Sequence, residues 1–166
     1  MPPFTHVERY IVYRAALWAS MLPGQADGAH FFARTKSFLV GLRAFKTLAN
    51  EPPYSEDSLL HDILSTDYRD LEVPENVRFE QTEGAEETYE QLLQMLREAR
   101  QLLVDKAGPE TADLYSRLVV EVARRNMNAS GGGLLGMSEH LSEVEKALLA
   151  HITDVMAPGD SPEECA

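Results

Sequence analysis

Apolar residues recur with helical spacing through most of the chain. The clearest amphipathic face runs from Phe31 to Ala49, where apolar positions step by three and four residues. Similar faces occur over residues 7–21, 59–64, 85–106, 109–127 and 144–156. β-branched residues are too few and too scattered to indicate strands. The pattern predicts an all-α fold, a single compact bundle of about five to seven helices.

Local signals mark where these helices begin and end. Thr5-His6-Val7-Glu8 and Ser142-Glu143-Val144-Glu145 each match a capping box, in which a hydroxyl and a carboxylate satisfy each other's free backbone N–H groups. Pro52-Pro53 prevents continuation of the second helix. Gly108 and Pro109 predict a very short joint between two antiparallel helices.

The stretch from residue 50 to residue 84 is the least regular. Ser55 or Ser58 is expected to cap a short helix over residues 59–64. Residues 67–84 then read as a long loop with few apolar anchors. Loops of this length often carry function, so we identify it as one place where a partner can bind.

The length of 166 residues favours one domain, which we place at residues 1–158. Residues 159–166 contain too little apolar material to fold and are expected to form a disordered tail. Two segments, residues 7–49 and 118–156, share a plan of helix, glycine-containing loop and helix. This internal similarity suggests two helix-loop-helix halves.

The chain carries a formal net charge of −12, and its longest basic cluster is Arg124-Arg125. A nucleic-acid partner would meet repulsion over most of such a surface, so we expect none. The one cysteine, Cys165, lies in the predicted tail and implies no disulfide. Residues 11–22 are too short an apolar stretch, and contain Arg14, so neither a signal peptide nor a membrane span is expected. These observations favour a cytoplasmic protein.

The glycine-rich loop does not support nucleotide binding. Residues 131–136 match G-x-G-x-x-G, but that motif holds a pyrophosphate only when a strand leads into it and a helix starts from it. Here a helix leads in and the next helix starts several residues too late. No other catalytic signature is present in the sequence, which favours a protein that is not an enzyme.

One group of residues has the chemistry of a metal site. His140 lies between Glu139 and Glu143, and carboxylate oxygens are usable ligands for divalent cations. The helix dipole offers a second explanation for Glu143, which stands in the first turn of the last helix. No cofactor is expected beyond a divalent cation at these residues.

Charged residues on the predicted helices have structural interpretations. Arg14 falls on the apolar face of the first helix, where we expect it to pair with a carboxylate or to extend to the surface. Arg117, Glu121 and Arg124 form an outer row that we interpret as solvated.

Two short elements resemble a known family. Ala26-Asp27-Gly28 and Ser142-Glu143-Val144-Glu145 are similar to the alanine-aspartate-glycine and serine-x-x-glutamate elements of the TerB-like, tellurite-resistance families. The resemblance implies a compact acidic all-helical domain with a stress-linked accessory role and, as in some of those families, a carboxylate metal site. Asp27 is the residue that the resemblance makes a ligand.

Three functional hypotheses remain from the sequence. The leading one is a non-enzymatic helical accessory or interaction domain that binds a protein partner or self-associates. The second is a TerB-like stress protein that binds a metal or small ligand through Asp27 and the acids near residues 130–141. The third is an enzyme whose site is assembled only in three dimensions, around Arg14, His61 and Asp27.

Overall fold

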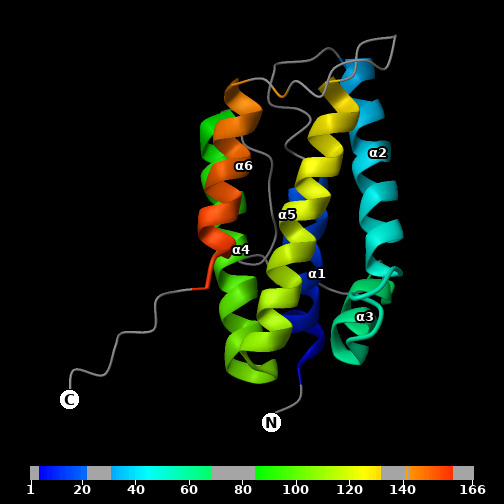
Figure 1. The fold of residues 1–166 in the computed structure, drawn as a ribbon, viewed down its shortest axis with the longest axis vertical. Helices are drawn as coiled ribbons and strands as arrows, with labels where there is room; N and C mark the ends of the chain where they lie inside the picture. Colours follow the sequence, from blue (N-terminus) through cyan, green and yellow to red (C-terminus); the bar gives the residue numbers. More distant parts are fainter. Residues whose placement is uncertain (1–3, 22–30, 69–84, 132–140, 142, 159–166) are drawn as a thin grey trace, which may run out of the picture.

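The computed structural model describes residues 4–21, 31–68, 85–131, 141 and 143–158. Within these residues every regular element is a helix, which confirms the predicted all-α bundle (Figure 1). The helices are α1 (His6–Met21), α2 (Phe31–Ala49), α3 (Ser58–Ser65), α4 (Ala85–Ala107), α5 (Pro109–Gly131) and α6 (Glu143–Met156). Helix α5 continues to Gly131, about one turn beyond the predicted end of the apolar pattern. No described helix is long and apolar enough to cross a membrane.

Helix α5 lies at the centre of the bundle. It packs against α1, α2, α4 and α6, and Figure 1 shows it in front of α1, between α6 on one side and α2 on the other. Its inward side chains are fully buried: Ala112, Tyr115, Leu118, Val119, Val122, Ala123 and Met127. The predicted apolar face of this helix is therefore confirmed.

Two buried polar side chains of α5 bind carbonyl groups of α1. The Tyr115 hydroxyl donates to the Val12 carbonyl oxygen at 2.9 Å, and the Asn126 amide donates to the Met21 carbonyl oxygen at 3.2 Å. Met21 is the last residue of α1, so Asn126 satisfies one of the carbonyls that a helix end leaves free. These bonds fix the position of α1 along α5.

Helices α1 and α2 approach each other most closely at Gly41. A Cβ atom at this position would lie 2.0 Å from the carbonyl oxygen of Ser20. Only a residue without a side chain therefore allows the two backbones to meet here. The sequence pattern of α2 does not reveal this requirement, because the contacting group lies on another helix.

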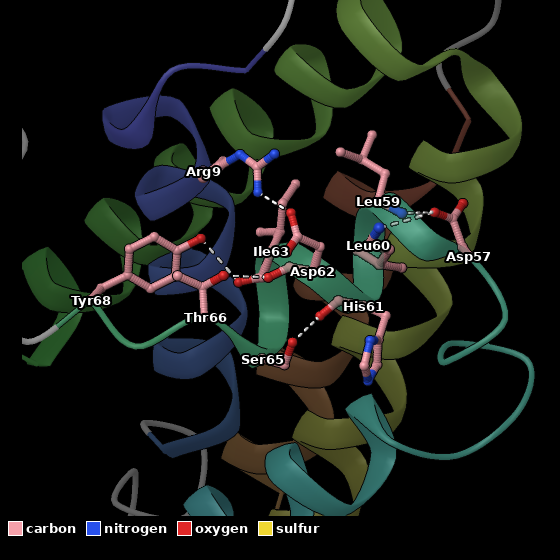
Figure 2. A network of polar contacts seen from close by, with 10 residues as sticks. All are labelled: Arg9, Asp57, Leu59, Leu60, His61, Asp62, Ile63, Ser65, Thr66 and Tyr68. Carbon is pink, nitrogen blue, oxygen red and sulfur yellow. Dashed lines mark hydrogen bonds and ion pairs between the residues drawn. The ribbon is translucent and has the colours of Figure 1, made fainter.

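The short helix α3 is held by polar contacts at both ends (Figure 2). At its start the Asp57 carboxylate accepts from the Leu59 and Leu60 N–H groups at 3.1 and 2.9 Å. The expectation that Ser55 or Ser58 caps this helix is therefore wrong. The second carboxylate oxygen of Asp57 accepts from the Thr111 hydroxyl of α5 at 2.8 Å, a bond that a shorter serine side chain does not offer.

Hydroxyl groups satisfy the carbonyls at the other end of α3. Ser65 donates to the carbonyl of His61, Thr66 to that of Asp62 and Tyr68 to that of Ile63, as Figure 2 shows. An ion pair between Arg9 and the Asp62 carboxylate joins α3 to α1. An eight-residue helix is marginal by itself, so these contacts and its buried leucines hold it in place.

The first predicted capping box is present. The Thr5 N–H donates to the Glu8 carboxylate at 2.8 Å, and the Glu8 N–H donates to the Thr5 hydroxyl at 3.2 Å. In the second box Ser142 lies outside the described residues, while Glu145 is buried on α6. Helix α1 packs against α2, and α5 against α6, but α2 also packs against α5 and α1 against α4, so the division into two helix-loop-helix halves stays a prediction from the sequence.

We expect Gly41→Ala to lower the free energy of unfolding by about 2 kcal/mol or more, because the added methyl group overlaps the Ser20 backbone. Urea denaturation measures this change. Gly108→Ala is the matched control: its φ of +95° is strained for alanine, but nothing lies within 4 Å of the new methyl group. We expect that variant to lose about 1 kcal/mol. Equal losses in the two variants would contradict the close approach of α1 and α2.

Candidate functional site

A groove with a volume of about 780 Å³ runs along the outer side of α5. One wall comes from the end of α2 and the connection to α3, and the other from the end of α6. We call it the α5 groove. Its lining residues are Leu48, Glu51, Pro52, Pro53, Tyr54, Asp113, Ser116, Arg117, Val120, Glu121, Arg124, Arg125, Thr153, Met156, Ala157 and Pro158.

The charged row predicted on α5 lies in this groove. Arg117, Glu121 and Arg124 recur at spacings of four and three residues, which places them on one side of the helix. All three line the groove, together with Arg125. The sequence predicted this charged row and favoured a solvated surface. It did not predict that residues 48–54 and 153–158 form walls on either side of the row.

Glu121 holds two of the arginines in place. Its carboxylate pairs with Arg124 and accepts from the Nε of Arg125 at 2.9 Å. Burial raises the pKa of Glu121, but the hydrogen bonds from the two guanidinium groups outweigh this effect and leave the pKa below its ordinary value. Arg125 also lies 3.9 Å from the carboxylate of Glu51. These contacts restrict the rotamers of Arg124 and Arg125.

Arg117 differs from the other two arginines. Among the described residues it has no ion pair or hydrogen bond, and its side chain is exposed. The nearby acid Asp113 is engaged by Arg100 of α4, whose Nη2 lies 3.3 Å from the carboxylate. The guanidinium of Arg117 is therefore available to an anion in the groove.

The remaining lining is largely apolar. Val120 of α5 and Met156 of α6 contribute from the two helices, and Pro52 and Pro53 form part of the opposite wall. Tyr54 is 9% exposed, and burial raises the pKa of its hydroxyl. The groove thus combines apolar contact surface with guanidinium groups, an arrangement that binds a ligand carrying both apolar and anionic parts.

The structure describes one of the four predicted metal ligands, Glu143. Asp27, Glu139 and His140 lie outside the described residues. Glu143 is exposed and pairs with Lys146 at 2.6 Å, and this hydrogen bond lowers the pKa of its carboxyl group. Across the described ranges no group of three His, Cys, Asp or Glu side chains could hold a metal ion. The metal site stays a prediction from the sequence.

Arg14 is buried in a different environment from the one expected. Its side chain is 8% exposed, and its Nε and Nη1 atoms have no hydrogen-bond partner among the described residues. The guanidinium carbon lies 5.6 Å from the centre of the Tyr10 ring, a cation–π distance. Burial lowers the pKa of Arg14. The predicted carboxylate pair is therefore wrong for the described part of the chain.

Arg14 and His61 do not share partners. The imidazole Nε2 of His61 lies 3.4 Å from the Asn50 amide oxygen, whereas Arg14 stacks on Tyr10. Asp27, the third member of the proposed catalytic group, lies outside the described residues. Among the described residues, Arg14 and His61 therefore do not form a common site that would support the enzyme hypothesis.

Comparison with protein-family models, curated proteins and solved structures gave no match. The resemblance to TerB-like domains therefore remains an expectation from the sequence.

We expect Glu121→Gln to lower the free energy of unfolding at pH 7 by up to about 1 kcal/mol, because these ion pairs are partly exposed. The pKa of Glu121 is lower in the folded state, so its stabilisation is present above the unfolded pKa of about 4.3. The stabilisation disappears as the pH falls through the folded value. Urea denaturation at pH 7 and pH 3.5 measures the loss of stability at each pH. The control is Glu90→Gln, at an exposed position of α4. A penalty that grows on acidification would contradict the assignment.

We expect Arg14→Met to raise the free energy of unfolding by about 1 kcal/mol. The substitution removes two unsatisfied buried donors, each costing roughly 1–3 kcal/mol, and gives up a weaker cation–π contact. Thermal and urea denaturation report the change. Arg9→Met on the same helix removes the ion pair with Asp62 and should give no gain. A loss of stability in Arg14→Met would show that the guanidinium is satisfied in solution.

Proposed function

We propose that the chain is a non-enzymatic helical interaction domain, and that its α5 groove binds an acidic segment of a protein partner. The observation that carries the proposal is the guanidinium of Arg117, which lies beside apolar surface and has no ion pair or hydrogen bond within the part of the chain that the structure describes. Arg124 and Arg125 extend the positive row and are already oriented by Glu121. Guanidinium groups bind carboxylates through paired, charge-assisted hydrogen bonds.

The charge of the whole chain makes this groove distinctive. The protein has 27 acidic and 15 basic residues, so most of its surface repels an acidic ligand. Three of the fifteen basic residues line the α5 groove, together with the three acids Glu51, Asp113 and Glu121, each of which lies within ion-pair distance of an arginine. The groove is therefore balanced in charge where the chain as a whole is acidic, and Arg117 is the lining arginine without an ion pair among the described residues. A nucleic acid, with a charge on every phosphate, would extend beyond the groove onto repelling surface.

The spacing of the arginines sets the spacing of the acids that fit them. Arg117 and Arg124 are seven residues apart on α5, which corresponds to about 10.5 Å along the helix axis. In a polyproline II peptide, which has three residues per turn and rises about 3.1 Å per residue, residues i and i+3 lie on the same face about 9 Å apart. An acid-x-x-acid segment therefore matches the two guanidinium groups. An apolar residue between the acids can contact Val120, which is partly exposed in the groove.

Fluorescence anisotropy tests this proposal. The probe is a labelled octapeptide with two glutamates three positions apart and a leucine between them. We expect Arg117→Gln/Arg124→Gln to weaken binding at least about ten-fold, because two charge-assisted contacts are lost. Arg43→Gln/Arg97→Gln is the matched control, since both residues are exposed and lie outside the α5 groove. Binding should also weaken with added salt.

Three results would overturn the proposal. One is the absence of saturable binding, another is equal binding by the two double variants, and the third is equal binding of a peptide with glutamine in place of glutamate. Preferential capture of a short single-stranded RNA would assign the groove to phosphate groups instead. Light scattering of the protein alone separately measures the self-association that the sequence left open.

A further inference from the structure

We infer that the chain's own C-terminal segment competes for the α5 groove and regulates access to it. This inference depends on the proposed function, since it names an intramolecular competitor for the same arginines. Three observations support it: where α6 ends, which residues follow, and how far those residues reach.

The C-terminal end of helix α6 lies in the α5 groove. Thr153, Met156, Ala157 and Pro158 all line it, and Pro158 is the last residue that the structure describes. The eight residues that follow are known by their sequence, Gly-Asp-Ser-Pro-Glu-Glu-Cys-Ala. They therefore start at the edge of the positive row on α5.

The sequence of this segment has the spacing that the groove selects. Asp160 and Glu163 are three residues apart, and Pro162 stands between them. This is the acid-x-x-acid pattern with an apolar residue inside it, derived above from the positions of Arg117 and Arg124. Glu164 adds a further negative charge to the segment. The segment carries no basic residue, so its charge is opposite to that of Arg117, the lining arginine without an ion pair among the described residues.

The segment is longer than the spacing between the two arginines. Five residues separate Glu163 from Pro158, and an extended chain of that length spans about 17 Å. Arg117 and Arg124 are about 10.5 Å apart along α5, so the segment is long enough to span the two arginines once it lies in the groove. A short tether gives an effective concentration in the millimolar range, so even a weak contact competes with a partner segment. The described residues form the groove without this segment, so the segment can bind there without having a stable fold of its own.

Paramagnetic relaxation in the full chain tests the contact directly. Cys165 is the one cysteine of the protein, so a nitroxide label can be attached there without any substitution. We expect the label to broaden backbone amide signals of Arg117, Val120 and Glu121. Broadening should fall at least about three-fold in Asp160→Asn/Glu163→Gln and at high salt, because the contact is electrostatic. Glu87→Gln/Glu90→Gln of exposed α4 changes the net charge equally and should retain it.

The same variants report on regulation through the labelled acidic octapeptide. We expect Asp160→Asn/Glu163→Gln to bind the octapeptide about three-fold or more tightly than the native chain, because the competitor is removed. Glu87→Gln/Glu90→Gln should bind it as the native chain does. An unchanged affinity in the tail variant, or equal broadening in all three proteins, would overturn the inference while leaving the groove's binding function intact. Failure of every form to bind the octapeptide would instead overturn the proposed function.

Discussion

Helix α5 packs against α1, α2, α4 and α6, and its Tyr115 hydroxyl donates a hydrogen bond to the Val12 carbonyl of α1. Because so many side chains of α5 are buried, the apolar core of the bundle is centred on this helix. Polar bonds from Tyr115 and Asn126 then set the register of α1 against it. The side of α5 left outside this core carries the arginine row, so the groove is a consequence of how the bundle is packed.

The buried polar groups of the bundle are satisfied to different degrees. Asp57 shows the efficient case, since one carboxylate caps α3 and also binds Thr111 of α5. Arg14 shows the costly one, because its guanidinium is buried against Tyr10 with two donors unsatisfied. Folding tolerates such a cost when the surrounding core is large, and here most of the described helices contribute to one continuous core.

Charge is distributed so that attraction for anions is local. A net charge of −12 repels acidic ligands over most of the surface. Within the α5 groove, the Glu121 carboxylate forms ion pairs with Arg124 and Arg125 and orients their side chains. Arg117 forms no ion pair among the described residues, so its positive charge is not neutralised by Glu121. Pro158 lines this same groove and is followed in the sequence by an acidic segment, which is why we propose the same arginines for partner binding and for its regulation.

The sequence by itself determined the elements whose causes are local. Apolar periodicity placed the helices, Pro52-Pro53 ended α2, and the Thr5 and Glu8 side chains began α1 as predicted. Only the tertiary structure decided the features that join distant residues. Gly41 matters because Ser20 lies against it, and Asp57 exceeds the nearby serines as a cap because Thr111 is within reach. The row on α5 was visible in the sequence, but its walls come from residues 48–54 and 153–158. Periodicity shows which side of a helix is polar, whereas a binding groove depends on what packs beside that helix.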